Sequence, residues 1–281
     1  MEDESIVANV IRHVRSKANG DPVDGQISVT INFHPDRYTI DGKPILCEMA
    51  KSQYLKSQFQ TGTSNGSISA YPGGARWSWE SKAFDSLYDN VDEKYRPKYG
   101  ALNYQNRPEG ASPRFGSAFF KLKTNVLDRT TFCFPDSYFG PDNFATYDSV
   151  SALIEMSINS KLDYLDNYIE AQIHGDLSFR KDVESLVLDP IFRGTEIEEY
   201  ARQLPVTLDW HRGFKMPVTI AQQQPDYRGA HIVKIAIDLA KDGNLNCLVL
   251  GAALKEGLYD PQDIKKAWHY LARFGAQTQN A

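Results

Sequence analysis

The sequence has few cysteines and no long apolar run, and both absences narrow the class of protein. Its three cysteines, Cys47, Cys133 and Cys247, lie far apart without CxxC spacing and cannot all pair, which argues against a disulfide framework and predicts a cytosol-like compartment. No stretch approaches the roughly 18 uninterrupted apolar residues of a membrane span, so no membrane partner is expected. Residues 1–5 (MEDES) are acidic and lack the basic-then-apolar order of a signal peptide. We therefore expect a protein that acts in the cytoplasm.

The chain also lacks an excess of positive charge. Its 281 residues carry a net charge of −5, which argues against general, charge-driven binding to nucleic acid. The distribution is uneven, because residues 94–129 hold eight Lys and Arg against two Asp and Glu, with aromatic residues between them. Basic groups with interleaved aromatics suit a single-stranded nucleic acid. The alternative is that these aromatics form the core side of two strands.

The motifs of several catalytic classes are missing. No HExxH, HxH or CxxC pattern accompanies His34, His174 and His211, so we assign no metal site. The loop GTSNG at 62–66 lacks the lysine of a phosphate-binding P-loop. The same five residues have GxSxG spacing, but they lie in a turn-rich loop and not at the strand-to-helix turn of a nucleophile elbow. These observations argue against zinc hydrolases with a recognised spacing of metal ligands, P-loop nucleotidases and α/β-hydrolases.

Hydrophobic periodicity predicts an α+β fold. Alternating apolar and β-branched residues predict strands, and spacing of three to four predicts helices. The order of elements suggests a mainly antiparallel, strongly curved sheet in a first part, 1–200, on which the N-terminal helix packs, and a mainly helical second part, 201–281. The expected strands are 27–33, 99–104, 115–122, 130–134, 168–174 and 183–188, and the expected helices are 5–18, 45–57, 147–163, 229–241, 244–257 and 261–274.

The strand at 168–174 carries the strongest chemical signal. Glu170, Gln172 and His174 stand at i, i+2 and i+4, so their side chains point to one face and suggest a cleft. A glutamate on a strand with a glutamine two residues further on is suited to binding a ribose, because its carboxylate can accept a hydrogen bond from a sugar hydroxyl. Its carboxylate can also stabilise the oxocarbenium-like state of glycosidic cleavage. The alternative is a surface strand with a salt bridge.

Two further places have two interpretations each. His34 ends a strand, where a side chain meets a cleft or plays a structural part. Trp77 and Trp79 form either a buried edge or an aromatic wall beside Arg76 and Glu80.

Several motifs together resemble a bacterial family of unknown function over about 33–195. They are FHPDR (33–37), SQFQTGTSNG (57–66), GGARWSWE (73–80), KYGALNY (98–104), SPRFGSAFFKLK (112–123), RTTF (129–132) and YIEAQIHGDLSFRKDVESLVLDP (168–190). The order of elements also resembles the DarT-like branch of ADP-ribosyltransferases, which modify nucleic-acid bases. In that resemblance His34 matches the histidine that ends the first core strand, Tyr99 or Tyr104 matches the aromatic motif, and Glu170 matches the catalytic glutamate.

The resemblance implies a split sheet of ADP-ribosyltransferase type and NAD as a substrate. The enzyme would be a glycosyltransferase that moves ADP-ribose from NAD to a macromolecular acceptor. It would act as a toxin or defence effector, including after delivery into the cytoplasm. An antitoxin or immunity protein would be a further partner. Glu170 and Arg76 would be catalytic, Tyr99 or Tyr104 would stack on nicotinamide, and Arg76 and Arg114 would meet the pyrophosphate. The NAD-binding set would be His34, Arg37, Ser64, Asn65, Tyr99, Tyr104, Arg114 and Gln172.

Other functions stay open. The same pocket without an acceptor would make an NAD glycohydrolase, and His34, His174 and an Asp would suit a metal-assisted hydrolase. A non-catalytic binding module that uses the 168–174 strand is the third alternative. The acceptor of a transferase is equally open between single-stranded DNA or RNA and a protein side chain.

Overall fold

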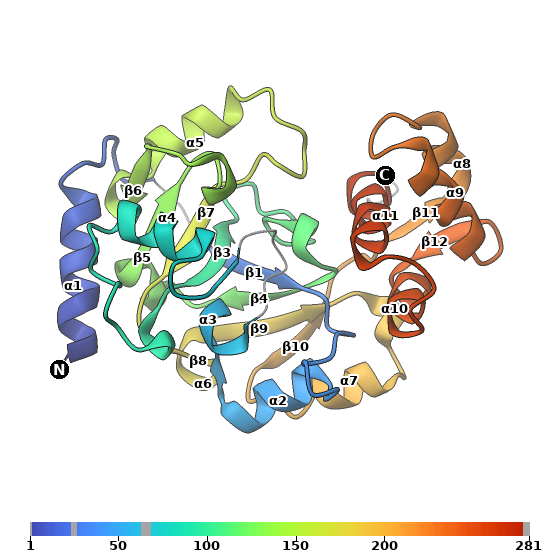
Figure 1. The fold of residues 1–281 in the computed structure, drawn as a ribbon, viewed down its shortest axis with the longest axis horizontal. Coiled ribbons are helices and arrows are strands. Elements are labelled where there is room, and N and C mark those ends of the chain that lie inside the picture. The colour runs from blue at the N-terminus through green and yellow to red at the C-terminus, as the bar shows by residue number, and fades with distance from the viewer. Residues whose placement is uncertain (1, 24–26, 63–68, 278–281) are drawn as a thin grey trace.

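The centre of the molecule is an eight-stranded sheet (Figure 1). The computed structural model describes the chain except residues 1, 24–26, 63–68 and 278–281. Among the strands in these described residues, all neighbours in this sheet run antiparallel except the first two, which run parallel. The order across the sheet is β10 (Thr207–Trp210), β9 (Val183–Leu188), β4 (Ala118–Leu122), β1 (Val29–Phe33), β3 (Lys98–Leu102), β7 (Glu170–Ile173), β5 (Thr130–Cys133) and β6 (Phe144–Thr146). The predicted mixed fold with a mainly antiparallel sheet is confirmed.

Both faces of the central strand β1 are covered. Ile31 and Phe33 belong to the main apolar core, whereas Thr30 and Asn32 are buried on the other face. Asn32 satisfies its side-chain amide with the carbonyl of Glu109 at 2.8 Å and the backbone amide of Ser112 at 3.2 Å. A buried amide needs such partners, because an unpaired one costs about 1–3 kcal/mol.

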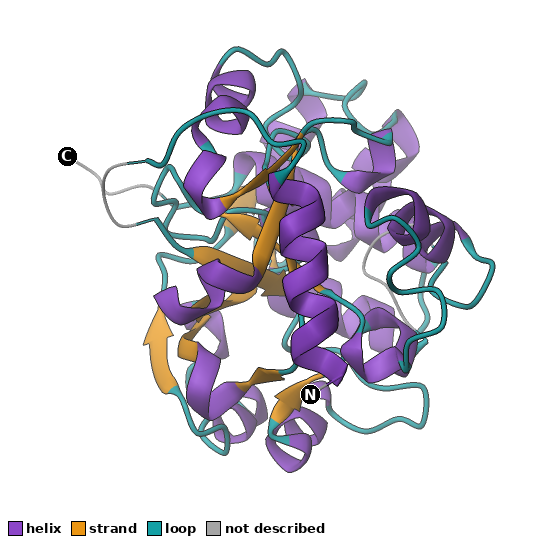
Figure 2. Ribbon diagram, turned by 90° about the vertical axis from the view of Figure 1, so that its left-hand side faces the viewer, coloured by secondary structure: helices purple, strands orange, loops and turns teal. Residues whose placement is uncertain are grey.

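Helices cover the β5–β6 end and the opposite edge of the sheet. Viewed from the side of the N-terminus, α1 crosses in front of the strands (Figure 2). Its Val10 and Val14 pack in one apolar cluster with Phe84, Tyr88 and Phe144. A small second sheet joins β2 (Tyr54–Leu55) and β8 (Leu177–Ser178). The helices of this part are α1 (Glu2–Arg15), α2 (Ile45–Ser52), α3 (Gln58–Thr61), α4 (Ala75–Ala83), α5 (Ser151–Ile158), α6 (Phe179–Asp182) and α7 (Glu196–Ala201).

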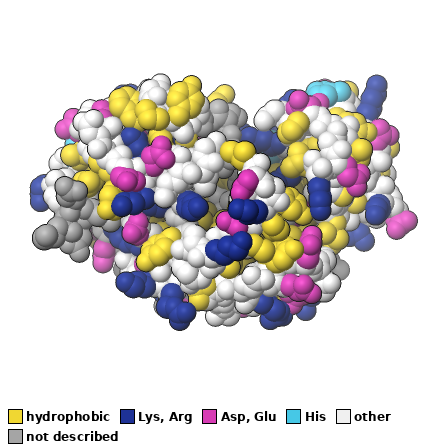
Figure 3. Space-filling view, turned by 60° about the horizontal axis from the view of Figure 1, so that its bottom comes forward, with side chains coloured by type: hydrophobic (Ala, Val, Ile, Leu, Met, Phe, Trp, Pro, Cys, Tyr) yellow, Lys and Arg dark blue, Asp and Glu magenta, His cyan; other side chains and the backbone are white. Residues whose placement is uncertain are grey.

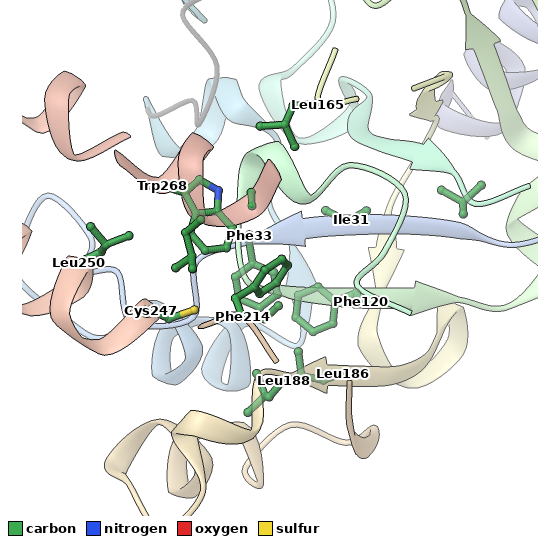
Figure 4. Packing of buried hydrophobic residues seen from close by; sticks show 14 of the residues in the cluster. Ile31, Phe33, Phe120, Leu165, Leu186, Leu188, Phe214, Cys247, Leu250 and Trp268 are labelled. Atoms are coloured by element: carbon green, nitrogen blue, oxygen red, sulfur yellow. The ribbon is translucent and has the colours of Figure 1, made fainter. Parts of the chain in front are cut away.

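The C-terminal part is helical but shares the core of the sheet. Trp268 and Phe214 pack face to edge and meet Phe33 beside the end of β1 (Figure 4). β10 comes from this part and pairs with β9, so the sheet crosses residue 200. The division of the chain into a first part, 1–200, and a second part, 201–281, stays a prediction. The elements are β11 (Lys215–Pro217), α8 (Val218–Gln223), α9 (Ala230–Leu239), β12 (Asn244–Asn246), α10 (Cys247–Lys255) and α11 (Pro261–Phe274).

Several elements differ from the sequence-based expectation. The helix expected over 45–57 ends at Ser52, because Gln53 adopts a left-handed conformation with φ 60° and the chain continues into β2. The helix expected over 147–163 is α5, which is half that length and follows a 3-10 turn at Tyr147–Ser149. Helix α4 and strands β6 and β10 were not anticipated, since α4 lacks an amphipathic stripe and the strands are three or four residues long.

We expect Gly116→Ala to destabilise the fold strongly. A Cβ on Gly116 would lie 1.9 Å from the carbonyl carbon of Phe33 and 2.1 Å from its oxygen, so two backbone segments would have to separate. The free energy of unfolding should fall by about 3 kcal/mol, measured by urea denaturation.

Gly42→Ala is the matched control. Gly42 also has a positive φ, +75°, but no described atom lies within 4 Å of its Cβ position. The strain of the left-handed conformation alone should cost about 1 kcal/mol. Equal losses in the two variants would contradict the close approach at Phe33.

Candidate active site

A cavity of about 600 Å³ lies where β1, β3 and β7 meet α2 and α4. This volume is within the range of about 300–1,000 Å³ that holds small ligands. Glu170, Arg76, Tyr99 and Arg114 line it together, and Lys265 of α11 joins them from the C-terminal part. The sequence predictions and the cavity therefore converge on the β7 strand.

Glu170 is held in the wall by hydrogen bonds. One carboxylate oxygen accepts from the Ser137 hydroxyl at 2.7 Å and from the Ser137 backbone amide at 3.3 Å. The other accepts from the Gln172 amide at 3.0 Å. The side chain is only 7% exposed. Burial raises the pKa of Glu170, and the opposing effect of the Arg76 charge does not cancel it.

Arg76 of α4 reaches the same carboxylate. Its Nη1 donates to the Ser137 hydroxyl at 2.8 Å and lies 4.0 Å from Oε1 of Glu170. The guanidinium carbon stands 4.0 Å from the centre of the Tyr99 ring, which is a cation–π contact. Burial alone would lower the pKa of Arg76, but the surrounding Tyr99, Glu170 and Glu80 outweigh it and hold that pKa above its usual value. Arg76 therefore stays charged.

Sheet register places Tyr99 beside this pair. Tyr99 of β3 lies directly across from Gln172 of β7, so its side chain shares the sheet face of Glu170. Its hydroxyl donates to Oε1 of Glu80 at 2.6 Å. Burial, followed by the charge of Glu80, raises the pKa of Tyr99 well above its usual value. The ring stays neutral and lines the cavity, with the Arg76 guanidinium over it.

A second buried ion pair supports Tyr99 from behind. Oε2 of Glu80 accepts from Nη1 of Arg96 at 2.5 Å, and Nη2 of Arg96 donates to the carbonyl of Tyr88 at 2.8 Å. Neither side chain of the pair is more than 3% exposed. Sequence reasoning missed Arg96 and named Glu80 only as a neighbour of Trp79. A helical interpretation of 75–83 would have placed Arg76 and Glu80 on one face, because they are four residues apart.

Ser137 is the main residue that the sequence analysis missed. It begins the 3-10 turn Ser137–Phe139, whose N-cap is Asp136. The Asp136 carboxylate accepts from the backbone amide of Tyr138 at 3.1 Å and from the hydroxyl of Tyr168. These bonds hold the Ser137 hydroxyl between Arg76 and Glu170. No signal in the sequence marks a single serine in a turn.

The remainder of the Glu170 strand face is covered, which corrects the expectation of a cleft along the whole face. Gln172 is fully buried and accepts from the Thr131 hydroxyl at 2.8 Å. The two ring nitrogens of His174 bond to the hydroxyls of Tyr88 at 2.8 Å and Thr131 at 2.9 Å. Burial, then Arg129 and Lys98, lowers the pKa of His174 to about 3, so its ring is neutral. Gln172 and His174 stand behind the site.

Other predicted residues lie elsewhere. Among the described residues, the lining of the cavity does not include His34, Arg37 or Tyr104. His34 packs edge-on against Trp268 of α11, with ring centres 4.8 Å apart. The Tyr104 hydroxyl lies 3.1 Å from that of Ser157, so Tyr99 is the one of the two candidate tyrosines that lines the cavity. The predicted residues Ser64 and Asn65 lie outside the described residues.

The described residues also bear on metal and membrane binding. Within the described part of the chain, no group of three or more His, Cys, Asp and Glu side chains is placed to hold a metal ion. No described helix is long and apolar enough to cross a membrane.

A family model described as "Protein of unknown function (DUF3626)" matches residues 28–163 and 151–274. The match therefore extends past 195 and includes the C-terminal helices, which corrects the range of about 33–195 suggested by the motifs. No curated protein matches the chain.

Two solved structures are similar to the chain at a TM-score of 0.38 each. The Thermus sp. 2.9 DarT in complex with NAD+ is 8% identical, and the match covers 68% of this chain and 98% of that one. The Thermus sp. 2.9 DarT in complex with carba-NAD+ is 10% identical, with 66% and 95% covered.

We expect Glu80→Gln to destabilise the protein by about 3 kcal/mol, because it leaves the Arg96 charge buried without its partner. Thermal or urea unfolding measures the loss. Glu184→Gln is the matched control, since Glu184 pairs with Lys121 at 2.7 Å on the surface, with the two side chains 52% and 40% exposed. The control should change stability by less than about 0.5 kcal/mol. Equal effects would show that the Glu80–Arg96 pair contributes no more than a surface pair.

Proposed function

The chain belongs to the DUF3626 family, whose function is unknown, and from this premise we propose that it is an ADP-ribosyltransferase that uses NAD as its substrate. The observation that carries the proposal is the contact between Glu170, Ser137 and Arg76 in the wall of a ligand-sized cavity. We also propose that the sheet is of the split, strongly curved ADP-ribosyltransferase type.

The chemistry of NAD fits this wall. Cleavage of the nicotinamide–ribose bond develops positive charge at the anomeric carbon, and a buried carboxylate stabilises that charge more than one in water does. Glu170 would supply the negative charge and accept a hydrogen bond from a ribose hydroxyl. The neutral Tyr99 ring would stack on the nicotinamide, while Arg76 would keep Glu170 ionised and oriented.

The rim of the cavity favours transfer over hydrolysis. Three tyrosines that line the cavity are also exposed at its mouth: Tyr38 is 38% exposed, Tyr54 45% and Tyr138 68%. Exposed aromatic side chains gathered at one opening are typical of a surface that meets another molecule. A glycohydrolase, whose acceptor is water, has no use for such a rim.

The acceptor is a macromolecule, either a nucleic-acid base or a protein side chain. The basic segment 94–129 does not supply an exposed strip for nucleic acid, because Arg96 and Lys98 are buried, as are Phe119 and Phe120. On the face seen in Figure 3, Lys and Arg side chains alternate with Asp and Glu. The role of toxin or defence effector, with an antitoxin or immunity protein and a cytoplasmic site of action, remains a prediction from the family resemblance.

Glu170→Gln should lower nicotinamide release from NAD by roughly 10²–10⁴-fold, as expected when a positioned catalytic group is lost. The fold should persist, because glutamine has the shape of glutamate and Arg76 keeps its bond to Ser137 and its contact with the Tyr99 ring. Released nicotinamide is quantified by chromatography, and the melting temperature of the same variant is measured. Glu184→Gln is the control and should keep full turnover. Full turnover in a folded Glu170→Gln variant would remove Glu170 from the mechanism.

Tyr138→Ala should reduce transfer of labelled ADP-ribose several-fold while nicotinamide release continues, because its ring stands at the mouth and not beside Glu170. Labelled NAD is supplied with separate pools of DNA, RNA and lysate protein, and the pool that takes the label identifies the acceptor class. Tyr71→Ala is the control, since Tyr71 is 60% exposed and is not among the described lining residues. Nicotinamide release with no labelled pool would favour the glycohydrolase.

A further inference from the structure

The end of the cavity beside α11 is rich in positive charge. Lys265 of α11 lines the cavity together with Arg114, which belongs to the 3-10 turn Pro113–Phe115. Trp268 fixes the two elements against each other, because its indole nitrogen donates to the carbonyls of Pro113 and Arg114 at 3.0 Å each. Burial, followed by the charge of Arg114, lowers the pKa of Lys265. The positive charge of Lys265 is thus held where it is unfavourable without an anion.

His269 stands one helical turn beyond Lys265 on the same face of α11. Its side chain is 5% exposed, and neither ring nitrogen has a hydrogen-bond partner among the described residues. Nε of Arg228 is buried without a partner as well. Buried polar atoms are nearly always bonded, so these nitrogens, which lie behind the described lining of the cavity, need a partner that the described residues do not supply.

The nearby carboxylates balance Arg114 but not Lys265. Asp166 pairs with Arg114, Asp163 with Arg273, and Asp263 with Lys266. Within the described residues, neither Lys265 nor Arg228 has a carboxylate within ion-pair distance. Burial and then the charges of Arg114, Arg228, Lys265 and Lys266 lower the pKa of His269 to about 2, so its ring is neutral and offers one N–H donor.

We propose that this end of the cavity, formed by Lys265 and Arg114 with His269 behind them, is an anion site for a pyrophosphate group. The inference rests on the proposed function, because NAD carries such a group between its two nucleosides. Lys265 would act as a compact point charge, and Arg114, which pairs with Asp166 through Nη1, would present its remaining N–H donors to phosphate oxygens. Arg76, the other arginine proposed for the pyrophosphate, is already committed to Ser137 and the Tyr99 ring. The C-terminal helix would then be part of the ligand site.

Binding of inorganic pyrophosphate and of ADP to the full chain tests the proposal, with adenosine as the uncharged comparison. Calorimetry at two salt concentrations should show that pyrophosphate and ADP bind and that adenosine binds more weakly. Lys265→Met keeps the apolar stem and removes the charge, and it should weaken pyrophosphate binding roughly ten-fold or more. Lys266→Met is the matched control: Lys266 is the next residue on α11, bonds to Asp263 at 3.2 Å and should leave the affinity unchanged.

A second variant keeps the test independent of Lys265. His269→Leu removes both unbonded nitrogens, so the ligand-free protein should melt at the same temperature or higher while pyrophosphate binds more weakly. A loss of melting temperature with unchanged pyrophosphate affinity would show that His269 is structural and would overturn its place in the site.

The outcomes separate this site from the proposed reaction. Pyrophosphate binding that depends on Lys265, without nicotinamide release from NAD, would support the anion site and reject the reaction. Nicotinamide release with equal pyrophosphate affinity in Lys265→Met and Lys266→Met would support the reaction and overturn the anion site. An absence of pyrophosphate binding to the unaltered chain would overturn the anion site as well.

Discussion

The site depends on keeping the Glu170 carboxylate charged inside the protein. Burial favours the protonated form, and the protein opposes this with Arg76, the Ser137 hydroxyl and amide, and the Gln172 amide. Each of these partners comes from a different element, so α4, the turn after β5 and β7 must meet at one point. The hydrogen bonds fix the carboxylate in one orientation, which is the condition for a charge that stabilises a transition state without reorganising.

A chain of buried contacts between acidic and basic side chains continues from the cavity into the protein. From Glu170 the contacts run through Arg76 and Tyr99 to Glu80 and then to Arg96, all buried or nearly so. Buried ion pairs of this kind are not an efficient source of stability, because desolvation offsets most of the attraction. Their value here is geometric: they fix the Tyr99 ring with the Arg76 guanidinium carbon 4.0 Å from its centre, in the wall of the cavity.

The C-terminal part is joined to the rest by more than its chain connection. β10 extends the sheet, Trp268 bonds to the turn that carries Arg114, and His34 packs on Trp268. The FHPDR segment therefore contacts α11. His34 therefore packs against α11 and is not in the described lining of the cavity, whereas the family resemblance implied that it contacts a ribose. The match of the family model through residue 274 agrees with a fold in which these helices are integral.

The sequence alone determined the elements whose pattern is local. Apolar and β-branched residues in VTINF and VESLVL and the capped helix after Asp260 were enough to locate β1, β9 and α11, because these signals lie within each segment itself. It also singled out Glu170, since Glu170, Gln172 and His174 stand at alternate positions on one face of a strand. Only the tertiary structure decided which polar neighbours share the cavity. Gln172 and His174 have the same strand parity as Glu170, yet Thr131 and Tyr88 cover them, and parity does not say where a neighbouring strand or helix ends. The site also contains or rests on residues that are far from Glu170 in the chain: Ser137, Arg96 and Lys265 are 33, 74 and 95 residues away. Contacts over such separations leave no periodic pattern in the sequence.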